Sequence, residues 1–224
     1  VSLHPMAPTD RIVPRFAAEP PQESLPYGQW ADTLKAELMP ELLRLETEDD
    51  GELPEGGLGD LGDITWYPDR TWGGRTFVPA TCTTSTGVEL YGVVSFAPAT
   101  DEDEEPAHFG AVADWTTETA AMNPDWTIDL CEEVIGQWRG EDGLAAAMTL
   151  VWGVPLVTGG LIATADLGDI TVDQCALLEN RFTLIAPDDY RGEWLSVGLY
   201  DRKGHQLARE SLYDEDDEPS PTDG

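Results

Sequence analysis

The sequence has few basic residues. It carries 12 Lys and Arg against 44 Asp and Glu in 224 residues, which gives a formal net charge of -32 at pH 7. Only Lys35 and Lys203 are lysines. A field of this sign repels nucleic-acid phosphates and anionic lipid surfaces. The composition therefore argues against direct binding to nucleic acid or to a membrane surface and favours a basic protein as partner.

Cysteine is also scarce. Cys82, Cys131 and Cys175 are odd in number and far apart, which argues against a disulfide framework or a Cys-x-x-Cys metal site. We expect three reduced thiols that pack as small core residues. Residues 1–16 lack the basic start and apolar run of a secretory signal, so a cytoplasmic location is expected.

Motifs that identify a chemistry are missing. The sequence contains no HExxH, no GxSxG, no Walker-type loop and no GxGxxG after a strand-like segment. His4, His108 and His205 have no Cys or His at ligand spacing, and the acidic residues form no calcium-loop pattern. We therefore expect no metal and no cofactor, although catalytic groups can still converge from distant positions.

One long stretch lacks charge. Residues 143–165 are uncharged and long enough to cross a bilayer of about 30 Å. Pro155 and the pair Gly159-Gly160 divide the stretch, and its flanks are acidic where a membrane span usually has a basic side. These interruptions favour buried strands and turns.

Acidic residues are spread over the whole chain, with two dense runs. Residues 101–105 are expected to form a solvated loop, and residues 214–218 open an acidic tail that extends to Gly224. Either run could instead be a docking strip for a basic partner or a mimic of nucleic-acid phosphates, and the sequence does not separate these alternatives.

The first half predicts an arm, a helix and a meander. Six prolines in residues 1–26 indicate a flexible arm. Trp30, Leu34, Leu38 and Leu42 recur every four residues and predict an amphipathic helix, with Pro40 causing a kink or a division into two helices. An antiparallel meander follows, with a hairpin loop at residues 85–87 and strands expected over residues 64–67, 75–83, 88–96 and 108–115.

A second helix is predicted over residues 123–140. Asn123 suits an N-cap, Pro124 the first helical position and Gly140 the C-terminal end. The apolar residues then fall on one helical face: Thr127, Leu130, Cys131, Val134, Ile135 and Trp138.

The last third is predicted to be a small β-sandwich. Six short strands are expected, over residues 148–152, 161–167, 170–178, 181–186, 194–200 and 207–213. Residues 187–192 could form a corner in which Tyr190 bonds back to the backbone, or a plain turn.

Together these patterns predict an α+β chain, a helix plus antiparallel meander followed by a small β-sandwich. The expected parts are an arm at 1–26, a helix-plus-sheet domain at 27–143, a sandwich domain at 144–213 and an acidic tail at 214–224. The pentapeptide at residues 61–65 recurs at 167–171, so a duplication in which each half is a helix followed by a meander remains an alternative.

One turn concentrates aromatic and arginine side chains. Such a combination is common at recognition surfaces, because aromatic rings supply rigid area and Arg supplies directed donors. The alternative is a strand end with a Trp tucked under the sheet and Arg70 paired with an acid. The candidate partner-binding residues are Trp66, Tyr67, Asp69, Arg70, Trp72 and Arg75.

Three functions follow as hypotheses. The first is a non-enzymatic interaction or structural protein whose acidic surface selects basic partners. The second is an acidic nucleic-acid mimic that occupies the groove of a DNA-binding protein. The third is an enzyme with dispersed catalytic residues, which would need a concave pocket with converging His or acid side chains of perturbed pKa.

Overall fold

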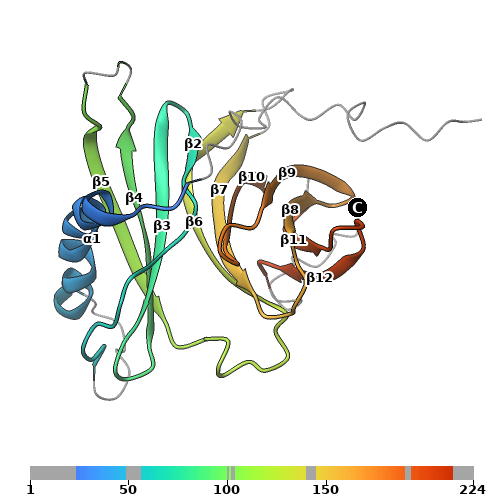
Figure 1. Ribbon diagram of the computed structural model, residues 1–224, viewed down its shortest axis with the longest axis horizontal. Coiled ribbons are helices and arrows are strands. Elements are labelled where there is room, and N and C mark those ends of the chain that lie inside the picture. The colour runs from blue at the N-terminus through green and yellow to red at the C-terminus, as the bar shows by residue number, and fades with distance from the viewer. Residues whose placement is uncertain are drawn as a thin grey trace, which may run out of the picture.

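The computed structural model describes residues 24–48, 57–99, 101, 104–139, 145–189 and 193–213. Within these ranges one helix and twelve strands form four layers, and every strand pair is antiparallel (Figure 1). The predicted α+β class, with a helix and meander followed by a sandwich, is confirmed.

Helix α1 (Gly28–Glu48) forms where the four-residue spacing predicts it. Leu34, Leu38 and Leu42 are buried against the first sheet. The helix continues through Pro40, so the predicted division into two helices is wrong. An internal proline costs about 3 kcal/mol, whereas each fully buried leucine contributes about 1.5–3 kcal/mol. Burial on both sides of Pro40 therefore offsets the lost backbone bond.

The first sheet is the predicted meander. Its strand order is β1-β3-β4-β5, with β2 paired to β3 on the same edge as β1. The Ser85 to Gly87 hairpin loop is confirmed, since the Gly87 amide donates to the Thr84 carbonyl at 3.0 Å and Gly87 has a positive φ of 84°. The strands are β1 (Thr65–Trp66), β2 (Arg70–Trp72), β3 (Arg75–Thr83), β4 (Glu89–Ala97) and β5 (Ala107–Thr116).

Two further sheets form the sandwich. The central sheet has the order β10-β7-β6 and the outer sheet the order β12-β11-β8-β9. All six strands predicted for the last third are present. The central strands are β6 (Ile128–Arg139), β7 (Ala145–Pro155) and β10 (Phe182–Asp188). The outer strands are β8 (Ile162–Leu167), β9 (Ile170–Ala176), β11 (Leu195–Tyr200) and β12 (Gln206–Ser211).

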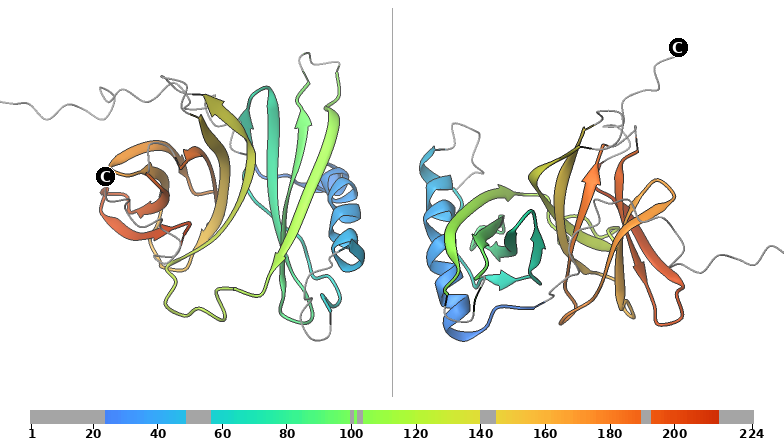
Figure 2. Two further views of the ribbon diagram at one scale, coloured as in Figure 1. Left: turned by 180° about the vertical axis from the view of Figure 1, so that it is seen from behind. Right: turned by 90° about the horizontal axis from the view of Figure 1, so that it is seen from above.

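The central sheet is covered on both faces. On one face, Met148, Leu150 and Trp152 pack against Tyr67 and Phe77, which lie on the side of the first sheet. On the other face Val151 and Leu184 pack with apolar residues of the outer sheet. The succession of helix, first sheet, central sheet and outer sheet is visible in the right view of Figure 2. An apolar core lies between each pair of neighbouring layers, and these cores hold the four layers together.

This double burial explains the uncharged stretch at residues 143–165. Its described part forms β7 and most of β8. A strand with both faces buried alternates between two apolar surroundings, so it reads as a continuous apolar run. No helix in the described ranges is long and apolar enough to cross a membrane.

The helix predicted over residues 123–140 is wrong. Residues 128–139 form β6, which pairs with β7 from Ile128 opposite Pro155 to Arg139 opposite Ala145. Leu130 packs towards the outer sheet and Cys131 towards the first sheet. Because both strand faces are covered, apolar residues occupy odd and even positions and imitate helical spacing. Asn123 is instead the first residue of a turn, in which its carbonyl accepts the Trp126 amide at 3.1 Å.

The duplication is also wrong. Leu61 makes an isolated bridge with Thr84, whereas the second copy of the pentapeptide forms the turn between β8 and β9, where Gly168 has φ 57°. The described part of the second half has no helix that would correspond to α1.

Several predicted segments fall partly or wholly outside the described residues. These are residues 1–23 of the arm, the tail from 214, Glu102 and Asp103 of the acidic loop, and Tyr190 of the proposed corner. The expected boundary at 143 and 144 lies in the undescribed connection between β6 and β7. The β6–β7 hairpin therefore places residues from both expected domains in one sheet.

Candidate functional site

Trp66 and Tyr67, two of the expected partner-binding residues, are buried. Trp66 is 8% exposed and packs in the core beneath α1, and its carbonyl accepts a hydrogen bond from Arg181 Nη1 at 2.6 Å. Tyr67 is 5% exposed and packs against the central sheet, with its hydroxyl 3.3 Å from Thr81 Oγ1. Neither ring lies on the surface.

Arg70 is the most buried charged residue of this turn. It is 1% exposed and its Nη2 forms an ion pair with Asp173 Oδ2, which links β2 of the first sheet to β9 of the outer sheet. The same Asp173 oxygen accepts the Ile185 amide of β10 at 2.9 Å. Arg70 and Asp173 thus join three sheets from inside the molecule.

The other three expected residues also make contacts within the chain. Asp69 Oδ1 accepts the Ser24 amide at 2.6 Å, and Arg75 Nη2 donates to Ser95 Oγ at 2.9 Å and to the His108 carbonyl at 2.8 Å. Trp72 covers Gly136 of β6, where an added Cβ would lie 2.5 Å from the ring. The arrangement is the alternative stated above, with rings beneath the sheet and Arg70 paired with an acid.

A different part of the molecule forms a pocket lined by acidic, aromatic and apolar side chains. It has a volume of about 500 Å³ and lies between the first sheet, β6, the end of β12 and the connection from β5 to β6. We call it the acidic pocket. Its lining residues are Tyr91, Thr116, Glu118, Trp126, Ile128, Leu130, Cys131, Glu132, Glu210, Ser211, Leu212 and Tyr213. Three of them are glutamates, and none is Lys, Arg or His.

Glu132 is the most perturbed carboxyl of the acidic pocket. Its Oε2 is buried and has no hydrogen-bond partner among the described residues. Burial, with smaller contributions from the nearby carboxylates of Asp188 and Glu133, raises the pKa of Glu132 to about 7. An unpaired carboxylate oxygen in a partly desolvated site costs free energy that an incoming cation would recover.

Glu210 is held differently. Its Oε1 accepts hydrogen bonds from the Thr127 amide at 2.9 Å and from Thr127 Oγ1 at 2.5 Å. These two donors fix the carboxylate of β12 against the start of β6. The acidic pocket therefore contains one anchored carboxylate and one carboxylate with an open position.

Aromatic side chains line the same space. Tyr213 packs edge-on against Trp194, with ring centroids 4.6 Å apart, and its hydroxyl donates to Asp188 Oδ2. Tyr91 packs against Trp152 in the core, with centroids 6.3 Å apart. Rings fixed in this way offer electron-rich faces to a cation at little entropic cost.

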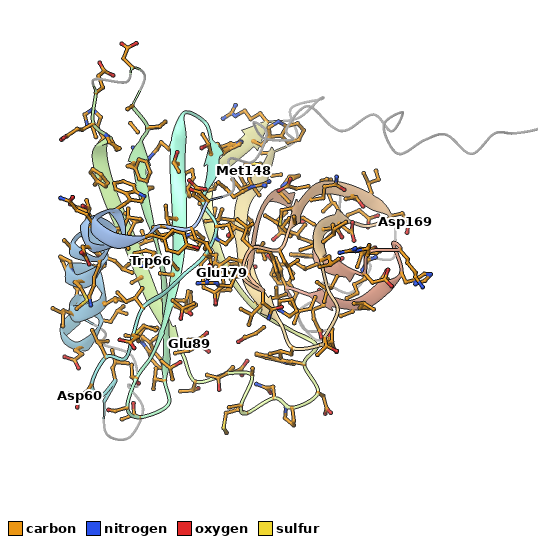
Figure 3. All side chains as sticks on the ribbon, viewed as in Figure 1. Asp60, Trp66, Glu89, Met148, Asp169 and Glu179 are labelled. Carbon is orange, nitrogen blue, oxygen red and sulfur yellow. The ribbon has the colours of Figure 1, made fainter. Side chains whose placement is uncertain are left out.

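A second carboxyl with a raised pKa, that of Glu89, lies next to Cys131 of the acidic pocket. Glu89 begins β4 and pairs with Thr116, the last residue of β5, at the end of the sheet from which the chain crosses to β6 (Figure 3). Burial and the nearby Asp129 raise the pKa of Glu89 to about 7, against a smaller lowering by the hydrogen bond from Cys131. Cys131 Sγ donates to Glu89 Oε1 at 3.8 Å.

Cys131 is a poor nucleophile in this setting. Burial and the neighbouring carboxylates hold the pKa of its thiol well above the usual value. The thiolate, which is the reactive form, is therefore suppressed. None of the three cysteines forms a disulfide. Among the described residues, no group of three or more His, Cys, Asp or Glu could hold a metal ion.

Reasoning from sequence missed the acidic pocket because it predicted a helix over residues 123–140, which include Glu132. The signal that could have corrected this is the density of β-branched and aromatic residues between Thr127 and Trp138, which favours a strand. Glu210 and Tyr213 lie far away in sequence, and only the sandwich brings them to β6.

No protein-family model matches the chain, and no curated protein or solved structure is significantly similar to it. The chemistry of the acidic pocket is therefore inferred from its own residues.

Proposed function

We propose that the chain is a non-enzymatic interaction protein that binds a basic protein partner, with the acidic pocket as the docking point. The observation that carries this proposal is the lining of the pocket. Its described lining contains Glu118, Glu132 and Glu210 and no positive side chain, and Glu132 Oε2 has no hydrogen-bond partner in the described part of the chain. Electrostatic complementarity then selects a cationic surface.

The charge of the whole chain supports the same proposal. A net charge of -32 attracts a basic protein from a distance and speeds encounter, and the effect weakens as salt shortens the Debye length. The negative charge attracts a basic protein, whereas it repels nucleic acid and anionic lipid. A cytoplasmic location belongs to this proposal, and cysteines without disulfides are compatible with it.

The test is direct binding of purified candidate partners over a range of salt. Partners captured at low ionic strength are purified and titrated against the wild type, against a Glu132→Gln/Glu210→Gln variant and against a Glu37→Gln/Glu46→Gln control. The control removes the same charge from exposed positions of α1. We expect binding that weakens steeply with salt and is lost in the pocket variant only.

Two results would contradict the proposal. One is the absence of any partner that binds directly at low salt. The other is equal loss of binding in the pocket variant and in the α1 control, since bulk charge alone would then explain the interaction. If the partner is a DNA-binding protein and DNA competes for it, the acidic mimic becomes the better description.

A specific observation keeps an enzymatic function as a second candidate. Glu132, with a pKa of about 7, and the anchored Glu210 line one pocket. Glycoside hydrolases use a protonated and an ionised carboxyl in this way. Hydrolysis of a panel of aryl glycosides by the wild type, with loss in Glu132→Gln and retention in Glu133→Gln, would favour this candidate over the first.

A further inference from the structure

The acidic pocket has two kinds of wall. Carboxylates come from Glu118, Glu132 and Glu210, and an apolar side is formed by Ile128, Leu130 and Leu212. A ligand that fills it must therefore carry a positive group on an apolar stem. A lysine side chain has this form, because four methylene groups end in a compact ammonium ion.

The acceptors of the acidic pocket come from separate groups. Glu132 Oε2 has no hydrogen-bond partner among the described residues, while Glu210 Oε1 accepts two bonds from Thr127. The Tyr213 hydroxyl donates to Asp188, which leaves its oxygen able to accept. An ammonium ion directs three donors to separate acceptors, whereas a guanidinium group is best matched by two parallel acceptors on one carboxylate.

We propose that the acidic pocket binds one alkylammonium group, the side chain of a lysine in the basic partner, with Glu132 as its counter-ion. This inference rests on the proposed function and names the chemistry of its docking point. A divalent metal is a poorer occupant, because the described residues offer no group of three ligands. Trp126 and Tyr213 supply aromatic faces beside the carboxylates.

Binding at this position is coupled to a proton. The pKa of Glu132 in the empty pocket is about 7, so the carboxyl is partly protonated at neutral pH and must ionise to pair with an ammonium ion. Lysine remains protonated in this range. Affinity should therefore rise from pH 6 to pH 8, by up to about tenfold, as the binding-competent form becomes fully populated.

The titratable groups that interact with Glu132 are carboxyl, phenol and thiol groups. Asp188 of β10 and Glu133 of β6 raise its pKa, and it in turn raises the pKa of its neighbours Tyr91, Cys131 and Tyr213. Glu118 and Glu210 share the pocket lining. No histidine is among the described residues that line the pocket, so a pH response between 6 and 8 reports on carboxyl groups.

The probe is the tripeptide acetyl-Gly-Lys-Gly-amide, titrated into the full chain and followed by the NMR signal of the Trp126 indole. Matched probes carry arginine or Nε-acetyl-lysine in place of lysine. Glu132→Gln is the test variant. Glu133→Gln is its control, because it makes the same change at the next residue of β6, whose side chain lines a smaller cavity between β6 and the first sheet.

We expect the lysine peptide to bind at least about tenfold more tightly than the acetylated peptide, since acetylation removes the charge. Glu132→Gln should weaken binding by a similar factor and abolish the rise from pH 6 to pH 8. Glu133→Gln should keep the binding and the rise, and move the rise only slightly to lower pH, because Glu133 is the smallest of the causes that raise the pKa of Glu132. Glu118→Gln removes an exposed carboxylate of the acidic pocket and keeps the Trp126 signal, so it provides a second pocket variant if Glu132→Gln does not fold.

Equal binding of lysine and acetyl-lysine, equal effects of the two glutamine variants, or preference for arginine would each overturn the inference. A basic partner that binds the wild type and Glu132→Gln equally would remove the lysine site and leave a partner-binding acidic surface. Binding of the lysine peptide without any protein partner would preserve the lysine site and contradict the proposed function.

Discussion

Arg70 carries the strongest residue-scale prediction about stability. Its guanidinium pairs with Asp173 inside the molecule, and the same carboxylate holds the β10 amide of Ile185. Removing one member of a buried pair leaves the other charge uncompensated, which costs about 3–5 kcal/mol.

Arg70→Ala should therefore lower the free energy of unfolding by about 3–5 kcal/mol, measured by urea denaturation. Arg44→Ala is the control, since Arg44 pairs with Glu41 at 2.7 Å on the exposed side of α1, and such pairs contribute about 0.3–0.5 kcal/mol. Equal losses in the two variants would show that the Arg70 pair does not join the sheets.

Glu132 gives a second residue-scale prediction, on pH. Its pKa is about 4.5 in the unfolded chain, the usual value, and about 7 in the fold. The folded state therefore binds more protons between these values, so stability falls as pH rises from about 4.5 to 7 and then levels off. Partial exposure limits the cost to about 2 kcal/mol.

Glu132→Gln should flatten this fall, measured as the urea midpoint between pH 5 and pH 8. Glu89, whose pKa is also raised to about 7, leaves a residual slope. Glu37→Gln, an exposed change on α1, should keep the full wild-type slope. If the urea midpoint of Glu132→Gln falls with pH as steeply as that of the wild type, the result would contradict the burial of this carboxyl.

At the residue scale, the sequence shows that the chain is strongly acidic but does not show where the acidic pocket lies. The turn around Arg70 stands out by composition, yet its side chains are directed inward because Trp66 and Tyr67 fall on opposite faces of a sheet covered on both sides. Glu132 does not stand out among 44 acids. Its character arises from burial, which depends on strands distant in sequence.

At the element scale, packing of β6 on the first sheet is tested at Gly136. A Cβ at this position would lie 2.5 Å from the Trp72 ring. Gly136→Ala should cost about 1–3 kcal/mol, and Trp72→Leu in the same chain should recover part of the loss by removing the clash.

Gly110→Ala is the matched control on β5. An added Cβ there would meet Ser95 Oγ at 3.8 Å, an ordinary contact. Its free energy of unfolding should change by less than about 0.5 kcal/mol. If Gly136→Ala is equally mild, or if Trp72→Leu adds to its cost, β6 does not approach the first sheet at this point.

Strand prediction succeeded where turns are marked and one face is clearly apolar. The strands of the meander and of the last third are bounded by Gly, Pro or acidic residues, and their positions are confirmed. β6 was mistaken for a helix because both of its faces are covered, which removes the two-residue alternation. The pairing of β6 with β7 is a tertiary fact that local pattern does not contain.

At the scale of the whole molecule, the net charge of -32 predicts that salt stabilises the fold. Like charges repel more strongly in the compact state than in the unfolded chain, and added ions screen this repulsion. The thermal midpoint should rise between low and high KCl. A midpoint that falls with KCl would show that ion pairs such as Arg70 with Asp173 outweigh the surface repulsion.

The four layers also explain how such an acidic chain folds. Its cores run on both sides of the first sheet and on both sides of the central sheet. The acidic pocket is one of the places where carboxylates reach this interior. Its response to a cation is therefore the most direct measure of what the fold is for.

The deciding measurement is the number of protons released when acetyl-Gly-Lys-Gly-amide binds at pH 7, obtained by calorimetry in buffers of different ionisation enthalpy. With a Glu132 pKa of about 7, about 0.5 proton should leave per bound peptide in the wild type. Release should be close to zero in Glu132→Gln and should persist, slightly reduced, in Glu133→Gln, because Glu133 makes only the smallest contribution to the raised pKa of Glu132. No proton release from the wild type, or equal release from both variants, would contradict a lysine site at Glu132.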